Sequence, residues 1–351
     1  MKALASNSVR IFLALLLALG FGLGSAGLAQ AASGDDVTWT VRTASNAFGA
    51  ERTSYNYTVN PGAKIEDAIV IANRGGAALD LGVYAADGYT TESGQFDLVV
   101  GGATSVGIGV WVKDSTESVT VGPGQTVEIP FTLTVPQNAT PGDYAGGIVT
   151  SLVQPGDTNG INVDRRLGIR IALRVGGDLR PSLAIEGQRV DWSGGLNPFA
   201  GGDATMSYTI HNTGNAVLSA QQTAAVTGPF GWLRSEAGAI EAPPQLLPGE
   251  SWKVTVPVHG VAAAVWLAAT TTVTPVVIDA SGSMTNLAPI VSTANGWAVP
   301  WTLLAIVAAL VALVILTPRL RKRRRMQQQA REDARVREAI EKALGATPTA
   351  S

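Results

Sequence analysis

The chain of 351 residues has no cysteine, so disulfide frameworks, thiolate metal sites and cysteine nucleophiles are all excluded. Histidine is nearly absent too, because His211 and His259 are the only two. Two imidazoles cannot form a zinc site of three histidines, and they leave little for catalysis by a serine and a histidine. We therefore expect a protein that is not an enzyme and that holds no metal ion and no cofactor.

Charged residues are also scarce, at 15% of the chain, whereas hydrophobic residues make up 46%. This balance excludes an intrinsically disordered chain and a long coiled coil. The 40 glycines and 18 prolines indicate many turns. At roughly 150 residues per domain, the length suggests about two domains in addition to targeting and anchoring segments.

The N-terminus has the pattern of a secretory signal peptide over residues 1–31. Lys2 and Arg10 precede an uncharged apolar run over residues 11–29, and the small-residue site Ala29-Gln30-Ala31 follows. An uncleaved membrane anchor is the alternative.

A second apolar run, WAVPWTLLAIVAALVALVIL over residues 297–316, is long enough to cross the roughly 30 Å core of a bilayer as a helix. Trp297 and Trp301 stand at its start, and six basic residues follow within residues 319–325. We therefore predict a single transmembrane helix over 297–316, followed by a basic cytoplasmic tail over 317–351 that is itself helical up to Gly345. A buried core helix is the alternative for the apolar run.

The charge balance differs on the two sides of this run. Between the two apolar runs there are 13 basic and 23 acidic residues, whereas the tail has 10 basic and 4 acidic residues. Net charges of -10 and +6 are expected when the two parts face different compartments, with the acidic part outside the cell. The acidic part is not expected to bind nucleic acid.

Hydrophobic residues alternate with polar or small ones along most of the region between the runs. Such alternation predicts β-strands that are separated by short turns rich in Gly, Pro and Asn. The clearest strands cover residues 127–135, 167–175 and 252–258, and weaker ones include 55–59, 79–83, 108–112 and 206–210. Short alternating strands with frequent turns predict an all-β protein with two tandem Ig-like antiparallel β-sandwich domains.

A repeated pattern divides this region in two. AIVIANRGG at residue 68 precedes VTVGPGQTVEIPFTLTV at residue 119, and MSYTIHNTGN at residue 206 precedes LLPGESWKVTVPV at residue 246. Each pair reads as a strand, an Asn-x-Gly turn, a Pro-Gly turn and a strand, because Asn and Gly tolerate positive φ in a turn and Pro-Gly favours a tight reversal before an alternating strand. The predicted domains are residues 35–176 and 181–291, with the boundary at Gly176-Gly177-Asp178.

Several stretches of the first domain are more specific than a generic sandwich. They are YTVNPGAKIEDAIVIANRG, VYAADG, VGIGVWV and VGPGQTVEIPFTLTVPQNATPGDYAGGIV, all within residues 57–149. Over about residues 37–175 the chain resembles the extracellular peptidoglycan-binding domain of the WxL-interacting protein family of Gram-positive bacteria, in particular its actinobacterial members. The resemblance implies a non-catalytic protein whose first domain binds peptidoglycan and whose second domain binds a surface protein partner.

Four residues beside turns are candidates for ligand contact in the first domain. Tyr89 follows Asp87-Gly88, and Tyr144 follows Gly142-Asp143. The tyrosine rings could stack on sugar faces, and the carboxylates of Asp87 and Asp143 could accept hydrogen bonds from sugar hydroxyls or stem-peptide amines. Packing in the core is the alternative for the rings, and turn stabilisation is the alternative for the carboxylates.

Three arginines on one predicted strand form a second candidate. Arg166, Arg170 and Arg174 share the face opposite the apolar residues of that strand. Such a row could bind peptidoglycan, an anionic wall polymer or an acidic partner. Charges that protect a sheet edge from aggregation are the alternative.

These patterns favour a membrane-anchored binding protein of the cell envelope. One alternative is an envelope sensor that passes ligand occupancy outside the cell to the cytoplasmic tail. Another is an exported hydrolase, which would need a pair of carboxylates in one cleft, and the sequence does not reveal such a pair.

Overall fold

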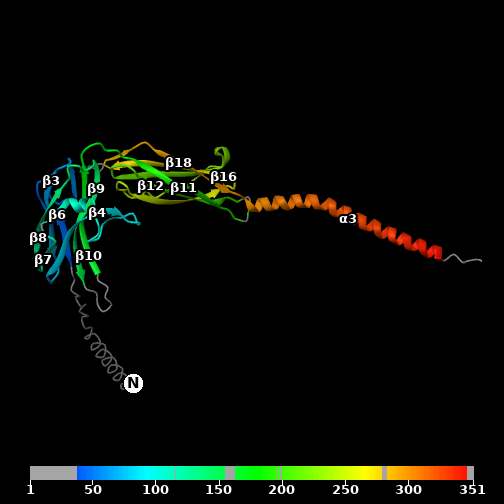
Figure 1. Ribbon diagram of the computed structural model, residues 1–351, viewed down its shortest axis with the longest axis horizontal. Helices are drawn as coiled ribbons and strands as arrows, with labels where there is room; N and C mark the ends of the chain where they lie inside the picture. Colours follow the sequence, from blue (N-terminus) through cyan, green and yellow to red (C-terminus); the bar gives the residue numbers. More distant parts are fainter. Residues whose placement is uncertain are drawn as a thin grey trace, which may run out of the picture.

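The computed structural model describes residues 38–114, 116–154, 163–195, 197, 200–278 and 283–345. Two β-sandwiches follow one another along the chain, and a single long helix extends from the second (Figure 1). The predicted fold class is therefore confirmed. The predicted signal peptide lies outside the described residues.

The first sandwich has one sheet in the order β1-β3-β8-β6 and a second in the order β2-β10-β9-β4-β5, where β7 also pairs with β4. Their inner faces enclose a core that includes Trp39, Leu81, Phe131 and Ile171. The elements are β1 (Trp39–Thr43), β2 (Tyr55–Val59), β3 (Lys64–Asn73), β4 (Leu79–Thr90), β5 (Phe96–Leu98), α2 (Ile108–Trp111), β6 (Val112–Asp114), β7 (Ser118–Val121), β8 (Thr126–Thr134), β9 (Gly142–Gln154) and β10 (Val163–Val175).

Two features of this sandwich differ from the predictions. β2 pairs with β10 in parallel, whereas we expected an antiparallel arrangement throughout. The predicted strand over residues 108–112 was wrong, because α2 occupies residues 108–111 and only Val112 belongs to a strand. The physical reason is Asp87, whose carboxylate accepts hydrogen bonds from the backbone N–H groups of Val106, Gly107 and Gly109 and so holds the chain in a helical turn.

The second sandwich packs the sheet β11-β12-β15 against the sheet β14-β13-β16-β17, where β18 also pairs with β16. Met206, Ile210, Leu218 and Val258 are among the residues buried between them. The elements are β11 (Leu183–Ser193), β12 (Gly202–Asn212), β13 (Leu218–Thr227), the 3-10 helix η1 (Pro229–Gly231), β14 (Ser235–Glu236), β15 (Ser251–Val261), β16 (Val265–Ile278), β17 (Met284–Asn286) and β18 (Ile290–Ala298).

The boundary between the second domain and the C-terminal helix lies later than predicted. The predicted domain ended at residue 291 and the predicted helix began at Trp297, but β18 continues to Ala298 and α3 (Trp301–Gly345) begins at Trp301. Trp297 belongs to the sheet because it pairs with Trp266 of β16. Pairing with β16 satisfies the backbone here, so this stretch is a strand despite its apolar sequence.

The long helix α3 is apolar in its first half, and at this length and composition it fits a single-pass membrane protein. It continues without a break through Pro318 and through the basic residues to Gly345, where the predicted tail helix also ends. The apolar segment and the basic segment that follows it are thus one helix (Figure 1).

The two Asn-x-Gly turns have the same structure in both domains. The buried Asn73 side chain donates to the carbonyls of Ala77 and Val121 and accepts from the N–H of Gly75. Asn212 makes the equivalent bonds to Ala216, Leu246 and Gly214. The side-chain amide stabilises both turns, and positive φ occurs not in them but at Gly124 and Gly249 of the Pro-Gly turns.

Candidate functional site

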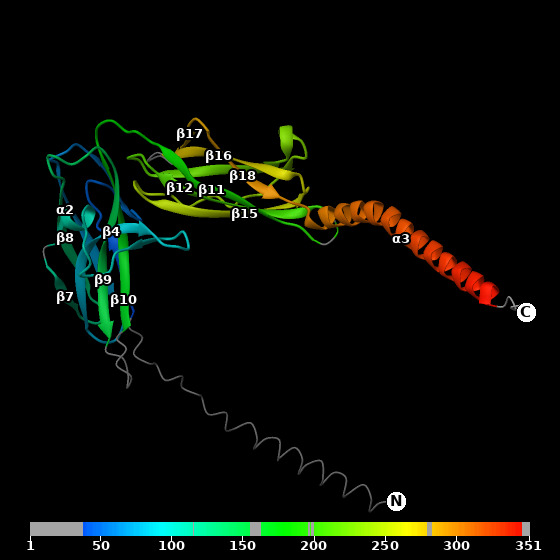
Figure 2. The same cartoon turned by 45° about the vertical axis from the view of Figure 1, so that its right-hand side comes forward.

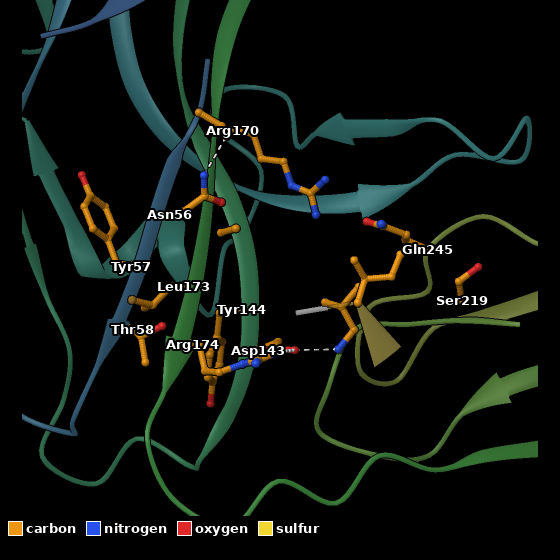
Figure 3. Close-up of a pocket in the computed structure, with 14 residues that line it drawn as sticks. Asn56, Tyr57, Thr58, Asp143, Tyr144, Arg170, Leu173, Arg174, Ser219 and Gln245 are labelled. Carbon is orange, nitrogen blue, oxygen red and sulfur yellow. Dashed lines mark hydrogen bonds and ion pairs between the residues drawn. The ribbon is translucent and has the colours of Figure 1, made fainter. Parts of the chain in front are cut away.

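A cleft of about 290 Å³ lies where the two sandwiches meet. The first domain lines it with β2, β9 and β10, and the second domain lines it with β13, the residues before β15 and the end of β16 (Figure 3). A second hollow of about 320 Å³ lies between the same domains and shares Asp143 and Tyr144 with the first. The cleft is therefore built by residues that are far apart in the sequence.

Loops of the two domains are joined by direct hydrogen bonds beside this cleft. The N–H of Asp143 donates to the carbonyl of Asn215, and the Asn215 side chain donates to the carbonyl of Pro141. At the other side of the interface, the Glu250 carboxylate accepts from both the N–H and the hydroxyl of Thr90, at 2.7 Å each. Thr90 ends β4, and Figure 2 shows the connection between β4 and β5 reaching toward the second domain.

Asp143 is the central residue of the interface. Its carboxylate accepts from Nε and a terminal nitrogen of Arg174 at 2.6 and 2.8 Å, and from the N–H of Val217 in the second domain at 2.8 Å (Figure 3). Arg174 lies directly opposite Asp143 in the pairing of β9 and β10. Asp143 thus joins the two domains through Val217, and because its charge and that of Arg174 neutralise each other, the two side chains are not available as a ligand pair.

Arg170 differs from Arg174 because no carboxylate pairs with it among the described residues. Its guanidinium lies 4.5 Å from the centre of the Phe96 ring, a cation–π contact, and its Nε is buried with no hydrogen-bond partner. Burial lowers the pKa of Arg170, although an arginine stays charged at neutral pH. Figure 3 shows the side chain extending from β10 toward Gln245 of the second domain. The cleft thus contains one positive charge without a counter-charge.

The structure brings together five of the seven predicted site residues at the junction of the domains. Asp143, Tyr144, Arg170 and Arg174 line the cleft, and Asp87, Asp143 and Tyr144 line the second hollow. The carboxylate of Asp87 is occupied by the turn before α2, which is the stabilising role given as its alternative. The Tyr144 ring packs 4.5 Å from Trp111, and its hydroxyl bonds to Thr140, so its free surface for stacking is limited.

The other two predicted residues lie away from the cleft. Tyr89 is 41% exposed on β4, and its hydroxyl is 3.5 Å from Asp97. Arg166 donates to the carbonyl of Leu98 and lies 4.0 Å from Asp164. The three arginines share one face as predicted, but each has a different environment and they do not form a continuous exposed row. Because β2 covers β10 only from Ile171 onward, edge protection fits Arg166 best.

Sequence reasoning missed the residues that complete the cleft. Phe96 meets Arg170 through packing within the first domain, whereas Gln245, Asn215 and Glu250 of the second domain come close only because the two domains pack together. The sequence held two signals for the cleft, the Gly142-Asp143-Tyr144 turn where β9 begins and the row of arginines on β10. Both histidines pair with carboxylates, His211 with Glu186 and His259 with Asp203.

No family model matches the chain, and no curated protein sequence matches it. The chain is similar to solved structures with PapD-like folds. One is a chaperone and tip-adhesin complex of CFA/I fimbriae. Its matched chain is 10% identical to this one, the match covers 73% of this chain and 98% of the matched chain, and the TM-score is 0.37. Another is the class 5 fimbrial chaperone CfaA, at 8% identity, coverage of 73% and 98%, and a TM-score of 0.33. At these identities the likeness concerns the Ig-like fold alone.

Proposed function

We propose that this chain is a non-enzymatic, membrane-anchored protein of the cell envelope that binds an anionic group of the cell wall in its interdomain cleft. One observation carries the proposal: Arg170 presents a half-buried guanidinium in the cleft without a carboxylate to neutralise it. Burying a cation without a counter-charge costs free energy. An anionic ligand would remove that cost and would accept a hydrogen bond from the buried Nε of Arg170.

The choice of a wall ligand rests on the sequence resemblance and on the charge of the region outside the membrane. A region with a net charge of -10 repels anions in general, so an anion must be recognised by a local feature such as Arg170. Peptidoglycan carries stem-peptide carboxylates and anionic wall polymers carry phosphates, and both groups match a guanidinium. The same proposal places both sandwiches outside the cell and the basic end of α3 in the cytoplasm. The proposal also includes a surface protein partner for the second domain, and this part rests on the sequence resemblance.

The test is a pull-down of the full chain, in detergent micelles, on purified cell-wall sacculi. Replacing Arg170 by Gln should weaken binding by about 10- to 100-fold, as expected for loss of a hydrogen bond to a charged group worth about 1.5–3 kcal/mol. Arg166→Gln is the matched control, because Arg166 lies on the same strand and face but outside the cleft. Full binding by the Arg170 variant, or an equal loss in the control, would contradict the proposal.

Sacculi that have been stripped of anionic polymers distinguish the two sources of the anion. Loss of binding after stripping assigns the ligand to a wall phosphate, and retained binding that still depends on Arg170 assigns it to a peptidoglycan carboxylate.

The envelope sensor is a second candidate, and one observation favours it: α3 is a single helix from the second domain to the tail. An unbroken helix transmits rotation or displacement better than a helix joined to its tail by a flexible linker. Deleting residues 326–351 should abolish a cellular response to wall damage if the chain is a sensor. The same deletion should leave sacculus binding and the response unchanged if the chain is only a binding protein.

A further inference from the structure

The second sandwich exposes a cluster of large apolar side chains at one end. In the connection between β13 and β14, Phe230 is 89% exposed, Trp232 is 72% exposed and Leu233 is 58% exposed. Val265, the first residue of β16, is exposed as well. Aromatic and aliphatic side chains of this size are normally buried, and several of them together on one end indicate a contact surface.

This end is the one from which the membrane helix starts. The N–H of Gly228 donates to the carbonyl of Trp232 and closes the loop, which lies against Ala264. The next residue, Val265, pairs with Ala298 at the end of β18, and α3 begins at Trp301, three residues after Ala298. Figures 1 and 2 both show this loop at the end of the second sandwich from which α3 starts. Trp297 and Trp301, which are 72% and 74% exposed, flank the same junction.

The backbone holds these side chains in unusual conformations. Phe230, Leu233 and Val265 have φ values of 60°, 55° and 66°, in the left-handed region that residues with a Cβ seldom adopt. They are three of the four residues other than glycine with positive φ in the part of the chain that the structure describes. Strain of this kind persists where it serves a purpose. Here it accompanies exposed apolar side chains at one end of the domain.

The described segments at this end carry little net charge. Residues 193–195, 197, 200–202, 228–234, 260–265 and 297–302 contain one charged residue, Arg234, and the nearest acids, Glu236 and Asp203, pair with Arg234 and His259. Elsewhere the region outside the membrane is acidic. A neutral, aromatic surface beside the start of a membrane helix matches the interfacial layer of a bilayer, where Trp and Phe are favoured.

We propose that the β13–β14 loop, with Phe230, Trp232 and Leu233, inserts into the interfacial layer of the membrane in which α3 is embedded. The helix keeps the loop at the bilayer surface, so a few aromatic side chains suffice for binding. The second sandwich then has two attachments to the membrane, and its orientation on the surface is fixed. This inference goes beyond the proposed function and does not depend on the cleft.

The absence of cysteine makes a direct depth measurement possible. Phe230→Cys, labelled with a nitroxide in the full chain reconstituted into vesicles of phosphatidylcholine and phosphatidylglycerol, should collide frequently with oxygen and rarely with a water-soluble nickel complex. Thr255→Cys is the control, because Thr255 is exposed on β15. Its label should show the opposite preference, with several-fold more frequent collisions with nickel.

Two outcomes would overturn the inference. Equal accessibility of the two labels to nickel would place the loop in water. Protection of the label at 230 from both oxygen and nickel would place the loop against protein, such as a second copy of the chain. Leu233→Cys is measured in parallel, so that a disturbed loop in one variant does not decide the result.

Discussion

Two charged side chains of the first sandwich show how surroundings decide the role of a residue. Asp67 is fully buried, yet it receives hydrogen bonds from Arg52, Tyr57, Asn46 and the N–H of Ala68. These hydrogen bonds satisfy the carboxylate and fix the packing of β2 and β3 around it, although the Nε of Arg52 itself has no hydrogen-bond partner. Arg170 is half-buried, and its Nε has no hydrogen-bond partner. Its position in the cleft makes it a candidate for binding an anionic ligand.

The Asp67 network should make the stability of the protein sensitive to acid. Burial raises the pKa of Asp67, but the hydrogen bonds from Arg52, Tyr57, Ala68 and Asn46 outweigh it and lower the pKa below its usual value. A carboxyl whose pKa is lower in the folded state contributes stability above its unfolded pKa of about 3.9, and that contribution is lost as the pH falls through the folded value. The free energy of unfolding should therefore decrease below about pH 4.

Thermal unfolding of the full chain between pH 7 and pH 3 measures this effect. Asp67→Asn should lower stability at pH 7 by about 3–5 kcal/mol, because it leaves the guanidinium of Arg52 buried without its partner. The decrease in the free energy of unfolding at acid pH should also become shallower. Glu66→Gln is the control, because Glu66 is the neighbouring acid, is exposed and pairs with Lys64. It should change neither the stability at pH 7 nor the steepness of the loss of stability at acid pH. An acid profile that is the same in Asp67→Asn and the wild type would disprove the assignment.

At the scale of elements, the repeated Asn turn is the feature that unites the two sandwiches. In each domain one buried amide joins the end of one strand to the segment just before the Pro-Gly turn. The backbone repeats the link, since the N–H of Asn73 donates to Gln125 and the N–H of Asn212 donates to Glu250. The two turns therefore serve as equivalent fixed points between the sheets of their domains.

Replacing either asparagine should destabilise its own domain. Asn73→Ala and Asn212→Ala each remove two hydrogen bonds that the side-chain amide donates to backbone carbonyls, at a cost of about 0.5–1.5 kcal/mol for each bond lost. Hydrogen exchange followed by mass spectrometry should show faster exchange in the first domain for Asn73→Ala and in the second for Asn212→Ala. Asn138→Ala, at an exposed position, is the control and should stay within about 0.5 kcal/mol of the wild type. Uniform acceleration in both domains would contradict separate roles.

Strands with strict alternation could be predicted from the sequence because their burial pattern is local. Residues 127–135 and 167–175 alternate and correspond to β8 and β10. The prediction failed where a distant group decided the conformation. Asp87, about twenty residues upstream, turns residues 108–111 into α2, and pairing with β16 keeps Trp297 in a strand. The site was predicted in part, because Asp143 and Arg170 stand out locally, whereas Phe96 and Gln245 join them only through packing between strands and domains.

At the scale of the whole molecule, the proposed function depends on how firmly the two sandwiches are joined. The cleft exists because Asp143 connects the first domain to Val217 and Asn215 of the second, and because Glu250 holds Thr90. A membrane contact at the far end of the second domain would fix the height of the cleft above the bilayer. A firm junction would then hold Arg170 at a defined distance from the membrane, within reach of the wall.

Asp143→Ala should loosen this junction without unfolding either domain. The substitution removes the acceptor of the Val217 N–H, the side-chain hydrogen bond by which Asp143 crosses the interface, and it removes the carboxylate that positions Arg174 beside the cleft. Because the chain has no cysteine, nitroxide labels at Asn138→Cys and Thr255→Cys report the distance between the domains. The distance distribution should be narrow in the wild type and clearly broader in Asp143→Ala. Asp164→Ala removes an acid that pairs with Arg166 and Ser151 inside the first domain, and it should leave the distribution unchanged. Equal widths in all three proteins would show that other contacts hold the domains together and that Asp143 is dispensable for the shape of the cleft.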